Sequence, residues 1–322
     1  MATPRIGIAF GGGAARGWAH IGVLKALLDA GIQPHCISGT SIGAVVGGCF
    51  AAGQLHQLEA FALSLTRRNV FSYFDLNLTG SGLINGNRLG QTLQVALGET
   101  VIEDLDLPFT AVATEIGTGH EVWLSRGSIV EALRASYAIP GVFRPVRFDG
   151  RWLFDGALVN PIPVTVCRAM GAQYVIAVNL NADLFGLGTV LQDVEATAEA
   201  ASDTTEKPTA RGNGWGARKL LQRQIFGRAT GDKEAAPSIS TVMVDAFNIV
   251  HDRIARSRLA GDPPDVMISP RLSGFGLFEF HRATEMIERG HRAAERILCD
   301  VKYDLDHSPA AARPTVIVNS AK

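Results

Sequence analysis

The residues whose spacing could support chemistry begin with a serine set between two glycines, in the run Gly39-Thr40-Ser41-Ile42-Gly43. A GxSxG run is typical of a nucleophilic serine, which must stand on a sharp turn between a strand and a helix with its Oγ exposed. Glycines two positions to either side let the strand and the helix approach without Cβ clashes. The pentapeptide alone also fits a tight turn with an ordinary capping serine.

A glycine-rich loop lies upstream of this serine, in the run Gly11-Gly12-Gly13-Ala14-Ala15-Arg16-Gly17. Backbone N–H groups in such a loop can hold an anion. That anion could be a nucleotide phosphate or the oxyanion of a tetrahedral intermediate. The dinucleotide spacing fails because Arg16 stands where the third glycine of GxGxxG would fall, and the acidic residue that such a site needs after the second strand is missing. A turn with no ligand is the remaining interpretation.

Two Asp-Gly pairs follow close together, and they differ in their surroundings. Asp149-Gly150 is flanked by alternating apolar residues, which is the pattern of a hairpin turn. Asp155, in the run Asp155-Gly156-Ala157, stands at the far end of the returning strand. A carboxylate placed there could act as a general base, or it could simply cap a turn or helix.

The histidines do not suggest a catalytic triad or a metal site. An α/β-hydrolase would place a histidine in a strand-end loop downstream of the acid. Solvated or helix-face positions are the favoured interpretation, and no pair has metal-ligand spacing. The sequence therefore predicts no metal and no cofactor. The eight histidines are His20, His35, His56, His120, His251, His281, His291 and His307.

Composition sets the broad class of the protein. The chain has 322 residues, 30 Lys and Arg against 31 Asp and Glu, and a formal net charge of −1, so nucleic acid is not an expected partner. Its four scattered cysteines read as buried thiols of a reducing compartment. No secretory signal is visible, and the longest apolar stretch, 42–53, is too short to span a bilayer. We expect a cytoplasmic protein that touches a membrane, if at all, from outside.

The elements that must position these residues alternate between strand and helix. Short β-branched or aromatic runs predict strands, and apolar residues at helical spacing predict helices. The order strand, glycine turn, helix, repeated twice at the start, indicates parallel βαβ units. Residues 146–154 predict a hairpin. Strands are expected over 5–10, 35–38, 109–114, 174–179 and 264–269, and helices over 20–30, 42–52, 128–136, 242–259 and 280–298.

The chain is predicted to contain a catalytic domain over residues 5–180 and a variable insertion over 184–238. The polar composition of the insertion favours a mobile segment. Its basic amphipathic stretch, 215–228, is either an interfacial helix or a solvated one. A helical C-terminal extension with a short strand is expected over 239–305, and a disordered tail over 306–322.

Together, in this order, the motifs resemble the patatin-like phospholipase family, and most closely its bacterial branch related to neuropathy target esterase. The resemblance rests on residues 11–24, on the GxSxG run with Ala44, and on Asp155-Gly156-Ala157. The stretches 135–143 and 160–163 also resemble segments of that family. The resemblance extends firmly over residues 5–180 and more loosely over 264–298.

The resemblance implies a three-layer α/β/α fold with a mainly parallel central sheet and a Ser–Asp dyad. The resemblance implies that Ser41 is the nucleophile and that Asp155 takes its proton. Ala14 replaces the commoner third glycine, and its backbone donor survives provided that its φ is negative. The implied oxyanion donors are Gly12, Gly13 and Ala14. The implied supporting residues are Gly11, Arg16, Gly17, Gly39, Gly43 and Gly156.

The function implied by this resemblance is hydrolysis of carboxylic ester bonds in lipids, of the phospholipase A, lysophospholipase or general esterase type. The partner would be a lipid or fatty-acyl ester substrate, with peripheral membrane contact compatible with the sequence. The alternative is a lipid-binding or regulatory adaptor with little or no catalysis, which loss of Ser41 or Asp155 would favour; both are present.

Overall fold

The structure is a computed structural model, and it describes residues 4–70, 87–183 and 239–307. The insertion expected over 184–238, including the amphipathic stretch 215–228, lies outside these residues, as does the tail from residue 308. The chain divides into two compact units, one of Met1–Leu184 with Val250–Lys322 and one of Phe185–Ile249. All that follows concerns the first unit. The domain boundaries inferred above stay a prediction.

The strands that the structure describes form a single sheet in the order β5-β6-β3-β2-β1-β7-β8, with β4 also paired to β3. Strands β3, β2, β1, β7 and β8 run parallel, whereas β4, β5 and β6 are antiparallel to their neighbours. The strands are β1 Ile6–Phe10, β2 Cys36–Thr40, β3 Phe109–Glu115, β4 Glu121–Leu124, β5 Val146–Phe148, β6 Arg151–Asp155, β7 Tyr174–Val178 and β8 Val266–Ile268.

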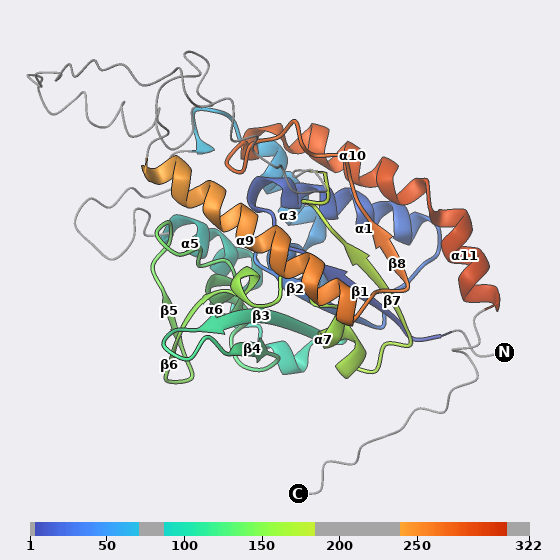
Figure 1. Cartoon of the computed structure of the whole chain (residues 1–322), viewed down its shortest axis with the longest axis horizontal. Helices are drawn as coiled ribbons and strands as arrows, with labels where there is room; N and C mark the ends of the chain where they lie inside the picture. The colour runs from blue at the N-terminus through green and yellow to red at the C-terminus, as the bar shows by residue number, and fades with distance from the viewer. Residues whose placement is uncertain (1–3, 71–86, 184–238, 308–322) are drawn as a thin grey trace, which may run out of the picture. The chain divides into compact units, whose positions relative to one another are not determined.

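Helices flank this sheet (Figure 1). Short 3-10 turns occur at η1 Ala14–Trp18, η2 Ile102–Asp104, η3 Gly156–Leu158 and η5 Phe280–Arg282. The helices are α1 Ala19–Asp29, α2 Ile42–Ala51, α3 Leu55–Ser64, α5 Asn87–Leu97, α6 Ile129–Ser136, α7 Val164–Ala169, α9 Ile239–Gly261, α10 Ala283–Glu295 and α11 Leu298–His307. The division between the two units falls within α9.

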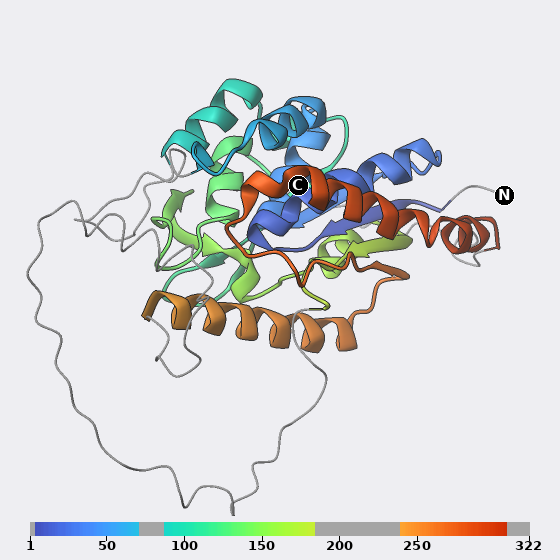
Figure 2. The ribbon, with the colours of Figure 1, turned by 90° about the horizontal axis from the view of Figure 1, so that it is seen from above.

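The sheet is buried on both faces, which explains why its central strands are continuously apolar. Ala9 and Ala177 point to one face, where they pack with α7 and with Ala255 of α9. Phe10 and Ile37 point to the other face, toward α2. Figure 2 shows α1 and α10 on that second side, and residues 250–261 of α9 lie on the first. The three-layer α/β/α arrangement with a mainly parallel sheet, expected from the resemblance, is therefore confirmed.

The elements expected around the catalytic motifs are present, with ends shifted by a few residues at most. The hairpin is confirmed, since Asp149 and Gly150 have φ of 46° and 78°, as a tight two-residue turn requires. The C-terminal helix expected over 280–298 is instead η5 followed by α10, and α11 continues to His307. Our sequence reading did not predict α3, α5, α7 or β4.

Helix α10 packs on α1 through two glycines. A Cβ on Gly22 would collide with the carbonyl oxygen of Ile287, and a Cβ on Gly290 would collide with that of Ala19. The two helix backbones therefore approach more closely than alanine would allow. This contact binds the C-terminal extension to the first βα unit, which carries the glycine loop.

We expect Gly290→Ala to destabilise the fold by about 1–3 kcal/mol, because the added methyl group meets backbone that cannot rotate away. A lower midpoint in thermal unfolding would show this. Gly261→Ala is the matched control, since a Cβ there meets no atom within 4 Å. Equal melting temperatures for the two variants would contradict the close helix contact.

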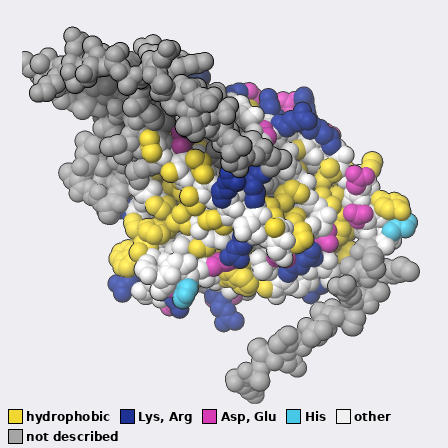
Figure 3. Space-filling view, viewed as in Figure 1, with side chains coloured by type: hydrophobic (Ala, Val, Ile, Leu, Met, Phe, Trp, Pro, Cys, Tyr) yellow, Lys and Arg dark blue, Asp and Glu magenta, His cyan; other side chains and the backbone are white. Residues whose placement is uncertain are grey.

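Within the described ranges, no helix has the length and hydropathy needed to cross a membrane. On the face seen in Figure 3, apolar side chains are interspersed with basic and acidic ones. Large apolar side chains that are strongly exposed include Val95 at 89%, Trp152 at 53% and Leu63 at 49%.

Candidate active site

The pairing of β3 explains why the two motif residues meet. Residues 111–112 of β3 pair with both β2 and β4, so those two strands lie on opposite edges of β3. Residues 113–114 pair with both β4 and β6, so β6 also lies opposite β4. Strands β2 and β6 therefore share one edge of β3 and follow one another along it.

Their ends converge on adjacent positions of that edge. Strand β2 ends at Thr40, which pairs with Val112, and β6 runs in the opposite direction and ends at Asp155, which pairs with Ala113. Ser41 follows Thr40 directly. The nucleophile candidate and the base candidate are thus brought together by strand register, although 114 residues separate them in the chain.

The backbone at Ser41 has the strain expected of a nucleophile turn. Its φ of 58° lies in the left-handed region that side-chain-bearing residues seldom occupy. A Cβ on Gly39 would come 2.5 Å from Ala44 Cα, and a Cβ on Gly43 would overlap the carbonyl oxygen of Phe10. Both glycines are required by close backbone approach.

A buried serine from α6 holds this turn in place. The Ser136 hydroxyl accepts a hydrogen bond from the Ser41 N–H at 2.9 Å and donates one to the carbonyl oxygen of Val112 at 2.6 Å. The sequence reading quoted Ser136 only as part of a family-like stretch and gave it no role. The only signal in the sequence was a serine at the end of a predicted helix.

Ser41 and Asp155 form a direct hydrogen bond. Ser41 Oγ donates to Asp155 Oδ2 at 2.6 Å, and the N–H of Ala157 donates to Asp155 Oδ1 at 2.8 Å. A Cβ on Gly156 would overlap the Val112 carbonyl, so glycine there lets η3 turn tightly against β3. The carboxyl group is thereby held with one oxygen on the turn and one on the serine.

Burial sets the charge state of this carboxyl. Asp155 is fully buried, which raises its pKa to about 7, although the hydrogen bonds from Ser41 and Ala157 partly offset the effect. A carboxylate with a pKa near neutrality is a much stronger base than an exposed aspartate. The arrangement can therefore remove a proton from the Ser41 hydroxyl near pH 7.

The glycine loop is fixed on one side by hydrogen bonds from neighbouring elements. The N–H of Gly11 donates to Val178, and the buried His20 Nε2 bonds to the carbonyl oxygen of Gly11 at 2.8 Å. The N–H of Gly12 donates to the carbonyl oxygen of Pro161 at 3.0 Å. Gly12 therefore anchors the loop, and its N–H is not available to an oxyanion in this structure, contrary to our expectation.

The N–H groups of Gly13 and Ala14 donate to no other group in the described part of the chain. Ala14 has a φ of 49°, so the negative φ that we expected is wrong, but its N–H has no acceptor among the described residues and can still donate to an oxyanion. An alanine at this φ stores backbone strain of about 1–2 kcal/mol. Strain of this kind persists only where surrounding contacts hold it.

Arg16 anchors the glycine loop through buried hydrogen bonds. It is 6% exposed; its Nε donates to the carbonyl oxygen of Phe275 at 3.0 Å and its Nη1 to Asn181 Oδ1 at 3.0 Å. Burial lowers its pKa to about 10, with the charges of Asp183 and Glu279 acting in the opposite direction. The guanidinium stays charged at neutral pH.

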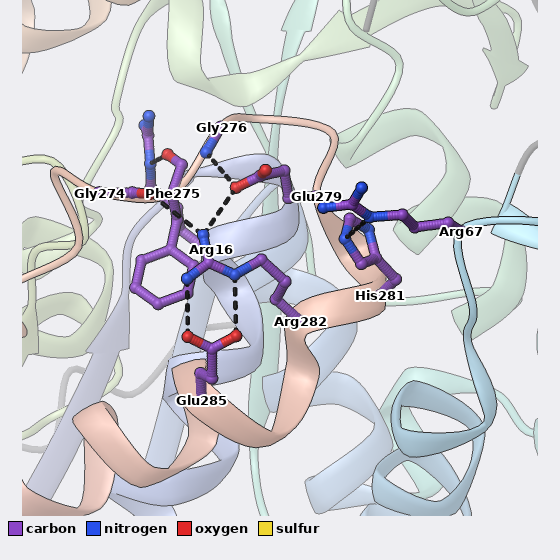
Figure 4. Close-up of polar contacts among 9 residues, drawn as sticks. All are labelled: Arg16, Arg67, Gly274, Phe275, Gly276, Glu279, His281, Arg282 and Glu285. Carbon is purple, nitrogen blue, oxygen red and sulfur yellow. Dashed lines mark hydrogen bonds and ion pairs between the residues drawn. The ribbon is translucent and has the colours of Figure 1, made fainter. Parts of the chain in front are cut away.

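Figure 4 shows the contact of Arg16 with Phe275, in the segment that also carries Glu279. Arg282 stabilises that segment, since it forms ion pairs with Glu279 and Glu285 and lies 4.0 Å from the Phe275 ring centroid. The C-terminal extension is therefore part of the support of the glycine loop. Gly17 completes the loop's packing because a Cβ there would overlap the Ile42 side chain.

An apolar pocket opens at Ser41. Its walls come from α2, α3 and α5 and from aromatic residues of the 278–280 turn, and few of its side chains have a polar group. Helices α3 and α5, which our sequence reading missed, thus form much of the pocket. The lining residues are Ala14, Trp18, Ser41, Ile42, Val45, Cys49, Gln54, Gln57, Leu58, Phe61, Leu65, Val70, Leu89, Thr92, Leu93, Ala96, Tyr137, Ile139, Phe143, Phe278 and Phe280.

Two histidines differ from our expectation of solvated or helix-face positions. His20 and His251 are both buried, and burial lowers the pKa of each to about 4, so both are neutral. The Ser41 hydroxyl donates to Asp155, and the Asp155 carboxyl accepts from Ser41 and from the Ala157 N–H, so neither histidine takes part in these bonds. Among the described residues, no group of three or more His, Cys, Asp or Glu side chains could hold a metal ion.

Comparison with known proteins agrees with the geometry. The family model described as patatin-like phospholipase matches residues 8–168, half of the chain. An uncharacterised NTE family protein of Mycobacterium tuberculosis is 35% identical, over 96% of this chain and 95% of that protein. The chain belongs to the patatin-like phospholipase family, and the resemblance inferred from its motifs is confirmed.

Other comparisons cover only part of one of the two chains. Lysophospholipase NTE1 of Mycosarcoma maydis is 35% identical over 55% of this chain and 10% of its own length. A second uncharacterised NTE family protein of Mycobacterium tuberculosis is 30% identical over 92% of this chain and 47% of that protein. The solved structure of VipD from Legionella pneumophila has a TM-score of 0.47 and 13% identity, over 93% of this chain and 67% of that one.

Proposed function

We propose that this protein is a serine hydrolase that cleaves carboxylic ester bonds of lipids through an acyl-enzyme. The observation that carries the proposal is the hydrogen bond from Ser41 Oγ to the buried Asp155 carboxyl, with Ser41 at the wall of an apolar pocket. Membership of the patatin-like phospholipase family and the likeness to a lysophospholipase support the substrate class. The proposed location is cytoplasmic, with a peripheral membrane contact.

In the proposed reaction, Ser41 Oγ attacks the ester carbonyl carbon as its proton passes to Asp155 Oδ2. The carbonyl oxygen becomes an oxyanion, which the N–H groups of Gly13 and Ala14 stabilise. Collapse of the intermediate expels the alcohol, which takes the proton from Asp155. Water then attacks the acyl-enzyme in the same way, releasing the fatty acid and restoring Ser41.

Several features of the site are consistent with this chemistry. The first-turn N–H groups of α2 begin directly after Ser41, so the positive end of the helix lies near the developing charge. The apolar walls suit an acyl chain, because each buried methylene contributes about 0.8 kcal/mol. Because Asp155 is fully buried, bulk water does not solvate its carboxylate and weaken it as a base.

The test is hydrolysis of a series of p-nitrophenyl esters from acetate to palmitate, together with release of fatty acid from a lysophospholipid. We expect turnover, with kcat/KM rising as the acyl chain lengthens until the pocket is filled. Binding of the same lipids without release of fatty acid would favour the adaptor alternative. No binding and no turnover would contradict the lipid assignment altogether.

The pH dependence of ester hydrolysis should follow the protonation state of Asp155. Only the ionised carboxylate can accept the Ser41 proton, so kcat/KM should rise with pH and reach half its plateau near pH 7. Below that point we expect a fall of about tenfold per pH unit. Initial rates of ester hydrolysis from pH 5 to 8.5 would measure this, with thermal unfolding at each pH as the control for folding. A flat profile would contradict Asp155 as the base.

A further inference from the structure

Asn181 is a buried side chain behind the glycine loop to which the sequence reading gave no role. It stands three residues after the end of β7 and is 4% exposed. Its Oδ1 accepts from Arg16 Nη1 at 3.0 Å. Its Nδ2 lies 2.8 Å from His251 Nδ1 and 3.4 Å from the carbonyl oxygen of Gly12. The glycine loop and helix α9 therefore both contact one amide group, which comes from the segment after β7.

The orientation of this amide is determined by its partners. A guanidinium can only donate, so the atom of Asn181 that faces Arg16 must be the oxygen. The amide nitrogen then faces His251 and Gly12. Since that nitrogen can only donate, His251 Nδ1 is the acceptor, and the proton of the neutral imidazole lies on Nε2. The amide is thus held with an N–H toward the loop carbonyl.

Peptide planarity transmits this contact to the reaction site. In a trans peptide the C=O and the N–H of one unit point in opposite directions. The carbonyl of Gly12 shares its peptide unit with the N–H of Gly13. Drawing that carbonyl toward Asn181 therefore turns the Gly13 N–H the other way. In the next unit, the Arg16 N–H holds the carbonyl of Gly13 at 3.2 Å, which directs the N–H of Ala14 in the same manner.

Gly12 lies next to both the nucleophile turn and His251. A Cβ there would lie 3.3 Å from His251 Nε2, 3.5 Å from Ser41 Cβ and 3.6 Å from Ala157 Cβ. Only the approach to His251 would be tight, and the other two distances are ordinary van der Waals contacts, so these neighbours lie close to the loop backbone. A small rotation of the Gly12–Gly13 peptide would move the Gly13 N–H relative to Ser41.

We propose that Asn181 is a positioning residue that orients the Gly12–Gly13 peptide so that the Gly13 N–H faces the oxyanion. Arg16 and His251 hold Asn181 in the required orientation and do not contact the substrate. The proposal rests on the hydrolase function proposed above, since it concerns stabilisation of the same intermediate. It adds a buried amide from the segment after β7 to the residues on which that reaction depends.

The sharpest variant is Asn181→Asp. One carboxylate oxygen can still accept from Arg16, and the other can accept from His251 once the imidazole proton moves to Nδ1. The carboxylate cannot donate to the Gly12 carbonyl, so only that contact is lost and replaced by repulsion. We expect kcat to fall by about 10²-fold, as on loss of an oxyanion donor, with KM nearly unchanged. Asn181→Ala, which introduces no charge, should have the same effect.

Binding of a transition-state analogue distinguishes a loss of oxyanion stabilisation from a general disturbance of the site. A long-chain trifluoromethyl ketone forms a bond from Ser41 Oγ to its carbonyl carbon, so its oxygen becomes an oxyanion while Asp155 takes the proton. The corresponding secondary alcohol occupies the pocket without bond formation. We expect the Asp and Ala variants to lose ketone affinity in parallel with kcat and to keep the affinity for the alcohol. The matched control, Thr110→Val, removes a buried hydroxyl bonded only to Met170 and should change neither.

The outcomes are distinct. A loss of less than about tenfold in kcat in a folded variant overturns the role of Asn181. Equal losses of ketone and alcohol affinity also overturn it, because they indicate a disturbed pocket. If the Asp variant does not fold, the Ala variant decides between the same results. Failure of the unmodified protein to hydrolyse any ester would instead refute the proposed function, so the two failures are distinguishable.

Discussion

Replacement of Ser41 by alanine is expected to abolish ester hydrolysis, with kcat reduced by about 10⁵–10⁶-fold. The variant removes the only atom proposed to bond to the substrate, and the loss of a nucleophile in comparable serine hydrolases is of this size. Folding should be retained, because the Ser41 N–H still reaches Ser136 and the side chain shrinks by one oxygen. The pocket walls stay unchanged, so lipid binding should survive the loss of turnover.

Covalent labelling gives a direct measurement. A fluorophosphonate probe should label the unmodified protein once, at Ser41, and should not label Ser41→Ala. Ser273→Ala, an exposed serine outside the pocket, is the control and should label normally. Labelling of the Ser41→Ala protein at another residue, with turnover intact, would show that a different nucleophile operates.

Replacement of Asp155 by asparagine is expected to reduce kcat by about 10³–10⁴-fold. The amide keeps the shape of the carboxyl but cannot accept a proton, so the loss is large, although smaller than the loss on removing the nucleophile itself. Labelling by the fluorophosphonate should slow in parallel, since it uses the same activated Oγ. A rate above about a tenth of the parent rate would refute Asp155 as the base.

The same substitution should not destabilise the protein at alkaline pH. The pKa of Asp155 is raised from 3.8 in the unfolded chain to about 7 in the fold, so folding favours the protonated carboxyl. Its contribution to stability is fully present below pH 3.8 and is lost as pH rises through 7. We therefore expect Asp155→Asn to melt at a higher temperature than the parent at pH 8. The difference should shrink near pH 4. A variant that melts lower at pH 8 would show that the carboxylate stabilises the site.

Much of the first half of the fold was predictable because its signals are local. The apolar run before Gly11 and the glycine turns at Gly11–Gly17 and Gly39–Gly43 together indicate successive βα units. The hairpin could be read from Asp149-Gly150 because a two-residue turn with positive φ accepts few residue types. The helices α3 and α5 were missed, as was β4, which is a four-residue edge strand with one fully buried residue.

The candidate site was only partly predictable, since hydrogen bonding in the loop depends on distant residues. That Gly12 donates to Pro161, and so is not a free donor, could not be read from seven residues of loop sequence. The φ of 49° at Ala14 is equally invisible there, because alanine normally disfavours it. The roles of Ser136 and Asn181 depend on their hydrogen-bond partners in other segments, and no motif assigns a chemical role to either residue.

The sequence by itself determined the family, the parallel βα architecture and the two side chains proposed to react, because each depends on residue types at short spacing. Tertiary structure alone decided that β2 and β6 end on neighbouring positions of one edge of β3, which places Ser41 Oγ 2.6 Å from Asp155. It also decided the raised pKa of that carboxyl and the orientation of the glycine loop. These properties arise from burial and strand register, which are set by contacts between segments far apart in the chain.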